Sequence, residues 1–161
     1  MKNIFSFIAI AVLCIALSGC PYQSSTPIDA PTIKVDTRLI GTWKSSGSDD
    51  DKYKISQADE FTYSFIKHSK GSEDEKYLGY FSVVNDVTFL NLYNDTGSDI
   101  ASRLYNLYRV DVKGDGVIIL KEMTENIDEE FTTSEELKKF IASNMNNSYF
   151  YSKDETIYSK Q

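Results

Sequence analysis

The chain has 161 residues and a formal net charge of −7 at pH 7, with 41% hydrophobic and 13% aromatic residues. That length is enough for one domain and not comfortably for two. The negative net charge argues against nucleic acid as a partner and against electrostatic binding to anionic lipid, because both need clustered Lys and Arg.

The N-terminus has the pattern of a secretory signal peptide. Lys2 precedes an apolar run, residues 4–17, and the small residues Ser18 and Gly19 follow it. Fourteen residues in a helix span only about 21 Å, short of a bilayer core of roughly 30 Å. A permanent transmembrane helix is therefore disfavoured.

Leu17-Ser18-Gly19-Cys20 resembles the lipobox of bacterial lipoproteins. The resemblance implies a signal peptide at residues 1–19, cleavage before Cys20, acylation of Cys20 and attachment to a membrane through the lipid. The alternative is an ordinary signal peptide with an incidental cysteine. In a two-membrane cell we expect the outer membrane, facing the periplasm, and a single-membrane host stays open.

Removal of residues 1–19 changes the charge and the thiol content of the chain. Loss of Lys2 leaves a net charge of −8, and loss of Cys14 leaves Cys20 as the one cysteine. If Cys20 carries lipid, the mature protein has no free thiol and no disulfide, so its core alone must hold the fold together.

The next segment predicts a linker. Pro21, Pro27 and Pro31 are the three prolines of the chain, and they lie among small polar residues. Proline disfavours ladder pairing and small polar residues bury little apolar area. Residues 20–37 are thus predicted to be a flexible tether, and residues 38–161 the folded domain.

The domain reads as a series of short antiparallel strands. Two turns mark hairpins, one at Asn85-Asp86 and one at residues 113–116, where Asp-Gly is a strong hairpin signal. Strands 77–84 and 87–93 are apolar on both faces, which predicts that another element covers their outer side. The expected strands are 38–44, 53–57, 61–68, 77–84, 87–93, 104–112, 117–123, 149–151 and 156–158.

One late segment departs from this pattern. Thr133 and Glu136 form a capping box, and apolar residues then recur at helical spacing, which predicts an amphipathic helix over residues 133–146. Glu135 and Lys139 form a favourable i,i+4 pair on it. Because closure removes exposed sheet edges, the predicted fold is mainly β: an antiparallel barrel of eight to nine strands with one C-terminal helix.

Gly41-Thr42-Trp43 resembles the Gly-x-Trp signature of the lipocalins, and the late helix has a similar place in the chain. The resemblance covers residues 39–159 in pattern. It implies an eight-stranded barrel with Trp43 packed across its closed end and a basic residue stacked on that tryptophan, for which Lys160 is the nearest match. A different small barrel or a sandwich stays open.

Aromatic residues are the candidates for a binding cavity. The chain has eleven Tyr, nine Phe and one Trp, which either fill a packed core or line a cavity. Alternation places three aromatic residues of strand 61–68 on the inward face with Trp43, and two residues of strand 104–112 join them. The candidate ligand-lining or core residues are Trp43, Phe61, Tyr63, Phe65, Tyr108 and Val110.

Other motifs favour surface roles. Residues 111–122 have the spacing of a calcium loop, but Lys113 places a cation in the site and strands flank it, so a hairpin turn is expected. Residues 49–51 are three aspartates in a solvated turn, and His68, the one histidine, lies at a strand end. No catalytic residue, metal or cofactor is predicted, and enzyme activity is not expected.

Two functions remain open. The first is a membrane-anchored lipoprotein whose barrel binds a small apolar or amphipathic ligand. The second is a structural or interaction lipoprotein with a packed barrel, acting through its surface on an envelope protein or as an inhibitor. A cavity in the barrel favours the first, and a packed interior favours the second.

Overall fold

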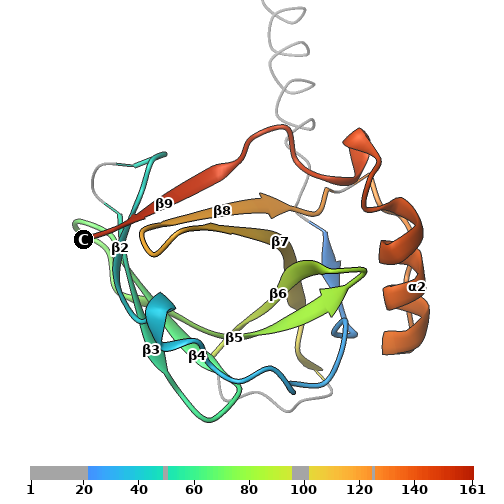
Figure 1. Ribbon diagram of the computed structural model, residues 1–161, viewed down its shortest axis with the longest axis horizontal. Helices are drawn as coiled ribbons and strands as arrows, with labels where there is room; N and C mark the ends of the chain where they lie inside the picture. The colour runs from blue at the N-terminus through green and yellow to red at the C-terminus, as the bar shows by residue number, and fades with distance from the viewer. Residues whose placement is uncertain (1–21, 49–50, 96–101, 125) are drawn as a thin grey trace, which may run out of the picture.

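The computed structural model describes residues 22–48, 51–95, 102–124 and 126–161. In this part of the chain eight antiparallel strands close into a barrel, and a further short strand and one α-helix lie outside it (Figure 1). The predicted fold class is confirmed. The predicted signal peptide and Cys20 lie outside the described residues. No helix in the described ranges is long and apolar enough to cross a bilayer.

The barrel strands follow the order of the chain, each paired with the next. The last strand, β9, pairs with the first, β2, and closes the ring. The strands are β2 (Gly41–Ser45), β3 (Lys52–Gln57), β4 (Tyr63–His68), β5 (Glu75–Val84), β6 (Val87–Asn94), β7 (Tyr105–Lys113), β8 (Val117–Glu122) and β9 (Thr156–Lys160).

Both predicted hairpins are confirmed. Asn85 and Asp86 connect β5 and β6 with φ of 47° and 64°, the left-handed conformation that a two-residue hairpin turn requires. Gly114 has φ of 60° in the turn between β7 and β8. The Asp111 to Glu122 segment is therefore a hairpin, as the interrupting Lys113 and the flanking strands predict.

A large apolar cluster lies outside the barrel, against the outer faces of β5, β6 and β7. Helix α2 (Ser134–Asn144) covers this face, with Leu137 and Ile141 fully buried (Figure 1). The predicted cap is present, since Thr133 Oγ1 accepts a hydrogen bond from Glu136 N at 3.3 Å. The expected cover over the doubly apolar strands is thus helix α2 and the N-terminal segment described next.

Residues 22–36, named here the N-terminal strap, differ from the expected tether. Strand β1 (Gln23–Ser24) pairs with the start of β7, and Ile28 is fully buried in the outer cluster. Buried Asn91 of β6 accepts a hydrogen bond from Ile28 N at 2.8 Å. The apolar side chains of Tyr22 and Ile28 dock the strap on the sheet despite its prolines.

Polar contacts also join the strap to the α2 region. Ser134 Oγ donates to the Pro27 carbonyl at 2.7 Å, and Lys138 forms an ion pair with Asp29 at 2.5 Å. Tyr80 Oη donates to the Asp29 carbonyl at 2.9 Å. The strap therefore lies fixed along the barrel wall.

Two predicted strands begin two or three residues later than expected, and a 3-10 turn replaces a third. Residues 37–39 form a 3-10 turn, η1 (Thr37–Leu39), because the Asp36 side chain caps it. Residues 149–151 form a second 3-10 turn, η3 (Ser148–Phe150), and one isolated bridge. Strand β4 begins at Tyr63 because the Asp59 carboxylate accepts hydrogen bonds from the two preceding backbone amides, at 2.8 Å each, and holds a turn.

The strap generates a stability prediction. Ile28→Ala should lower the free energy of unfolding by about 2–4 kcal/mol, because it leaves a cavity in the outer cluster. Urea unfolding of residues 22–161, followed by the fluorescence of the single tryptophan, measures the change. Thr32→Ala, on the exposed side of the strap, is the control and should change stability by less than about 0.5 kcal/mol. Equal effects of the two substitutions would contradict a docked strap.

Candidate functional site

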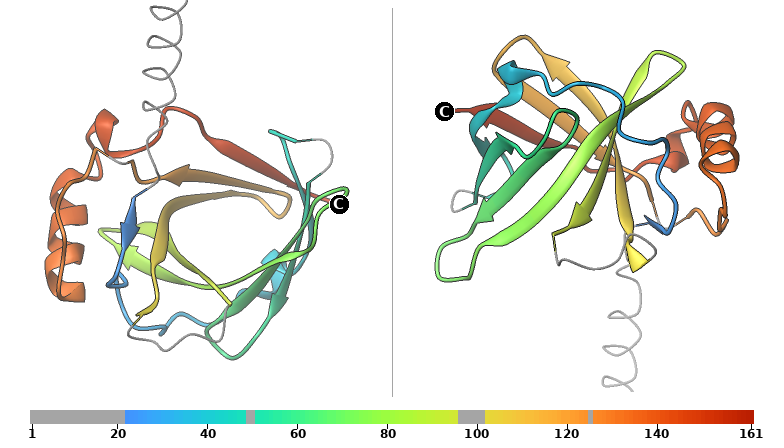
Figure 2. Two further views of the ribbon diagram at one scale, coloured as in Figure 1. Left: turned by 180° about the vertical axis from the view of Figure 1, so that it is seen from behind. Right: turned by 90° about the horizontal axis from the view of Figure 1, so that it is seen from below.

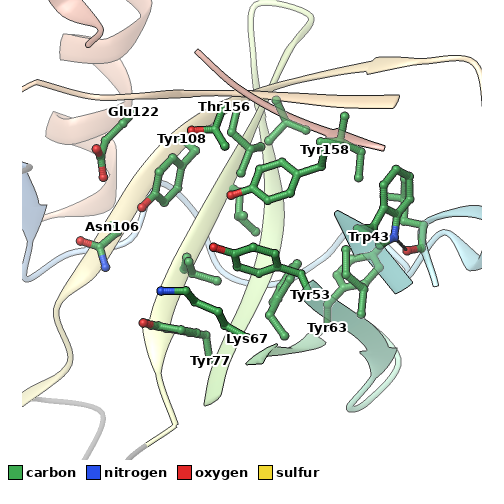
Figure 3. A pocket seen from close by; sticks show the side chains of 18 of the residues that line it. Trp43, Tyr53, Tyr63, Lys67, Tyr77, Asn106, Tyr108, Glu122, Thr156 and Tyr158 are labelled. Carbon is green, nitrogen blue, oxygen red and sulfur yellow. Dashed lines mark hydrogen bonds between the residues drawn. The ribbon is translucent and has the colours of Figure 1, made fainter. Parts of the chain in front are cut away.

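The interior of the barrel holds a cavity of about 590 Å³ (Figure 3). Every barrel strand contributes inward-facing side chains to its wall. Leu39 of η1, Gln23 of β1, and Ser152 and Asp154 before β9 also line it. Most of the deeper wall is apolar or aromatic. The lining includes Leu39, Trp43, Tyr53, Ile55, Tyr63, Phe65, Phe81, Leu90, Leu92, Tyr108, Val110, Ile118, Leu120 and Tyr158.

One end of the barrel is closed. Trp43 of β2 is 1% exposed and donates its indole N–H to the Leu39 carbonyl at 2.9 Å. This bond ties the tryptophan to η1, whose Leu39 side chain is also buried against it. The cavity therefore has an apolar floor, here named the closed end.

Lys160 is placed over Trp43, as the resemblance implies for a basic residue. Its ammonium nitrogen lies 5.7 Å from the indole ring centroid and donates to the Arg38 carbonyl at 2.7 Å. Gly41 leaves room for this side chain, because a Cβ there would lie 2.9 Å from Lys160 Cε. Gly41 also has φ of +146°, which side-chain-bearing residues rarely adopt.

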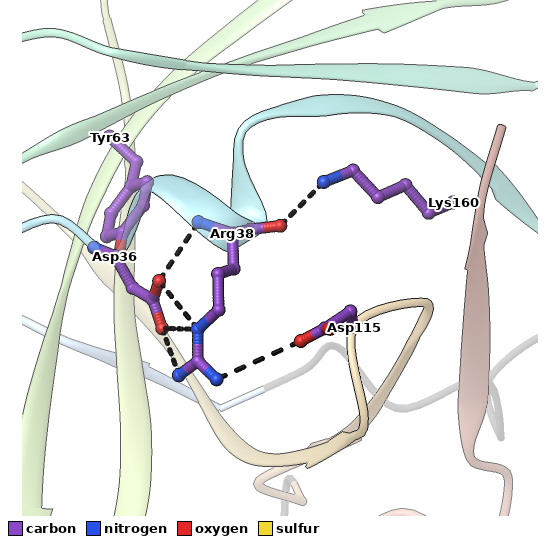
Figure 4. A network of polar contacts seen from close by, with 5 residues as sticks. All are labelled: Asp36, Arg38, Tyr63, Asp115 and Lys160. Atoms are coloured by element: carbon purple, nitrogen blue, oxygen red, sulfur yellow. Dashed lines mark hydrogen bonds and ion pairs between the residues drawn. The ribbon is translucent and has the colours of Figure 1, made fainter.

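A polar network ties η1 to its surroundings at this closed end (Figure 4). Arg38 pairs with Asp36 at 2.7 Å and approaches Asp115, in the β7–β8 turn, at 3.8 Å. The hydrogen bond from Arg38 lowers the pKa of Asp36. Asp36 N donates to the Tyr63 hydroxyl at 2.6 Å, which links the exposed network to the cavity wall.

Tyrosine hydroxyls gather toward the opposite end of the cavity, here named the mouth. Figure 3 shows the rings of Tyr53, Tyr108 and Tyr158 with their hydroxyls directed away from Trp43. Burial is the main cause that raises the pKa of each of these three tyrosines. All three hydroxyls therefore stay protonated at neutral pH and can donate hydrogen bonds.

Charged side chains lie in the mouth as well. Lys67 lines the cavity and pairs with Glu75 at 3.0 Å, and this bond raises the pKa of Lys67. Hydrogen bonds from Tyr77 and then from Lys67 lower the pKa of Glu75. Glu122 of β8 also lines the cavity, and no ion pair joins it to a cation within the described ranges. The mouth thus carries one neutralised cation and two carboxylates, that of Glu122 beside the Tyr108 hydroxyl and that of Asp154 just before β9.

Five of the six candidate residues predicted from the sequence line the cavity. Trp43, Tyr63, Phe65, Tyr108 and Val110 do so, from β2, β4 and β7.

The sixth candidate, Phe61, does not line the cavity. It lies in the turn before β4, half-buried and away from the cavity lining, because the hydrogen bonds to Asp59 delay the start of the strand. The alternation of inward-facing and outward-facing side chains begins at Tyr63, so it does not predict the direction of Phe61 in the turn.

Sequence reasoning missed several lining residues. Tyr53 and Ile55 lie two residues apart in a predicted strand and therefore share a face. Their apolar character could have identified that face as the inward one. Glu122 faces the cavity because it pairs with Tyr108 across the β7–β8 ladder, and only the register reveals this. Lys67 likewise faces inward because it pairs with Tyr53.

The remaining motifs stay on the surface. His68 is exposed, with its Nδ1 atom 2.6 Å from an Asp74 carboxylate oxygen. Asp51 accepts a hydrogen bond from Ser69 at 2.6 Å, while the other two aspartates of that triplet lie outside the described residues. Within the described ranges no group of three His, Cys, Asp or Glu residues is placed to hold a metal ion.

Comparisons of the chain with protein-family models, with curated proteins and with solved structures find no significant match. The site must therefore be interpreted from its own geometry.

The buried tyrosines generate a pH prediction. Nine of the eleven tyrosines have a pKa above the ordinary value of 10, and that of Tyr77 is raised to about 12. Because the folded state holds these protons more tightly, their stabilising effect is complete below pH 10 and is lost as the pH rises through the folded-state values. Ultraviolet absorbance should show most tyrosines ionising only above pH 10, together with a fall in unfolding free energy. Ionisation of all eleven near pH 10 in the folded protein would contradict the burial.

Proposed function

We propose that this protein is a lipid-anchored protein of the cell envelope whose barrel binds a small amphipathic molecule. The observation that carries the proposal is the cavity. Its volume of about 590 Å³ lies within the range of roughly 300–1,000 Å³ that is usual for ligand pockets. A barrel that served only as a packed scaffold would fill this space with side chains.

The distribution of polar groups supports an amphipathic ligand. Apolar side chains around Trp43 surround the closed end, while tyrosine hydroxyls and charged groups lie toward the mouth. A ligand with an alkyl or ring portion would bury that portion at the floor. Its head group would then meet the hydroxyls of Tyr108 and Tyr158.

The charges at the mouth favour a neutral or cationic head group over an anionic one. Lys67 is already neutralised by Glu75, whereas the carboxylates of Glu122 and Asp154 also line the cavity and can accept hydrogen bonds. An ammonium group is attracted by a carboxylate and by the faces of tyrosine rings. A carboxylate or sulfate head would instead be repelled by Glu122.

Attachment through Cys20 completes the proposal. The basic start, the apolar run and the Leu17-Ser18-Gly19-Cys20 motif support export and acylation. Lipid chains contribute about 0.8 kcal/mol per buried methylene, so more than one chain gives lasting attachment. In a two-membrane cell we place the protein in the outer membrane, facing the periplasm.

The alternative function, an interaction protein with a packed barrel, has less support. Its barrel would hold no cavity of this size. The large hydrophobic side chains exposed in the described residues are dispersed over several elements, for example Val83 on β5 and Tyr149 in η3.

Ligand binding can be tested through Trp43, the one tryptophan of the chain. We expect ω-bromododecanol to quench Trp43 fluorescence saturably, because bromine at the chain end reaches the floor of the cavity. Leu120→Phe, which extends a lining side chain into the cavity, should weaken this binding by about tenfold or more, the size of a modest steric cost.

Ile119→Phe is the matched control, because Ile119 is the neighbour of Leu120 on β8 and faces the other side of the wall. It should leave the affinity unchanged. Absence of saturable quenching, or equal affinities for both variants, would refute binding in the cavity.

The head-group preference gives a second binding test. We expect ω-bromododecylamine to bind more tightly than the alcohol and ω-bromododecanoate to bind least tightly. Glu122→Gln keeps the shape of the side chain and removes its charge, so amine affinity should fall by about tenfold, the usual value of a charge-assisted hydrogen bond. Alcohol affinity is the internal control and should not change. An unchanged affinity for the amine would show that Glu122 does not recognise the head group.

A further inference from the structure

We infer that the mouth of the barrel faces the membrane to which the protein is anchored, so that the cavity opens toward a lipid surface. The inference rests on the proposed acylation of Cys20. It is carried by the strap, which fixes the positions of Tyr22 and Gln23 relative to the barrel.

Strand β1 lies beside the start of β7. Gln23 lines the cavity and pairs with Asn106, near the start of β7. Its side-chain amide donates to the Asn106 side chain at 3.1 Å. Because β7 begins at the mouth and ends at the closed end, Gln23 lies at the mouth.

Only a short length of chain separates Cys20 from Gln23. Three residue steps separate Cys20 from Gln23, so their Cα atoms are at most about 11 Å apart in any conformation. A flexible tether of residues 20–37 would instead have a reach of roughly 60 Å. The docked strap removes that freedom.

The closed end is farther from Gln23 than this length of chain can reach. From Asn106 to Lys113, β7 rises by roughly 23 Å toward the closed end. This is about twice the greatest distance that Cys20 can lie from Gln23. Cys20 therefore cannot reach the end of β7 at Lys113, whereas the mouth lies within its reach.

The edge of β7 beyond β1 is already occupied, so the residues before Gln23 cannot follow it toward the closed end. Met123 N donates to the Leu107 carbonyl at 3.1 Å, so the chain leaving β8 occupies this edge just beyond β1. Tyr22 cannot extend the β1 ladder along β7. Its hydroxyl instead donates to the Glu129 carbonyl at 3.2 Å, which holds the base of the strap outside the barrel.

The closed end lies on the far side of the molecule. The right-hand view of Figure 2 shows the C-terminus and η1 at the end opposite to the loop between β4 and β5. With acyl chains leaving the polypeptide beside the mouth, Lys160 and the Arg38 network point away from the lipid. An amphiphile could then pass between the lipid surface and the cavity over a short path.

Site-specific quenching tests this orientation. Full-length acylated protein is reconstituted into vesicles of phosphatidylethanolamine and phosphatidylglycerol that carry a nitroxide on the lipid head group. A fluorescent thiol label is attached in turn at Glu73→Cys, in the loop between β4 and β5, at Lys113→Cys, at the closed end, and at Lys139→Cys, on α2. All three positions are exposed, so the labels should not disturb the core.

We expect loss of fluorescence at position 73, little or none at position 113, and an intermediate loss at position 139. Quenching at 113 equal to or stronger than at 73 would overturn the orientation, and strongest quenching at 139 would show that the barrel lies on its side. Intact mass is measured on the same samples. An unacylated chain would overturn the anchor and the orientation together, whereas acylated protein with the wrong quenching order would overturn the orientation alone.

Discussion

Pairing of the last strand with the first is the constraint on which the rest of the structure depends. The β2–β9 ladder places Trp43 opposite Lys160 and Ser45 opposite Tyr158, and it turns an open sheet into a ring. Closure leaves no unpaired long edge and gives the cavity a continuous wall. The same ladder brings Lys160 over the indole ring, so the element that closes the barrel also completes its floor.

The outer cluster supplies apolar burial, so the barrel interior need not be filled with side chains. The outer faces of β5, β6 and β7 bury side chains beneath helix α2 and the strap, and fully buried residues such as Ile28, Phe89 and Leu137 lie there. In a domain with no disulfide among its described residues, this outer cluster supplies apolar burial that the lumen does not. The outer face of the sheet thus contributes to stability, and its inner face lines the cavity. This division explains why two strands are apolar on both faces.

Local signals in the sequence predicted most of the elements. Turn chemistry identified both hairpins, the capping box identified α2, and alternation identified five residues of the cavity wall. Phe61 was assigned wrongly because a side-chain hydrogen bond, which alternation does not record, ends the strand pattern. Glu122 and Lys67 were missed because their inward direction depends on register with neighbouring strands. The prolines and small polar residues of the strap led to the prediction of a flexible tether. Tyr22 and Ile28 are nevertheless buried against the sheet.

The central claim is that the barrel cavity holds an amphipathic molecule in the cell. Native mass spectrometry of the protein, extracted in mild detergent from the membranes of its own host, tests this claim most directly. We predict a retained molecule of defined mass, present at one per chain, that is absent from the Leu120→Phe variant and retained by Ile119→Phe. Recovery of the bare chain from all three preparations, or of the same bound mass regardless of the substitution, would contradict it.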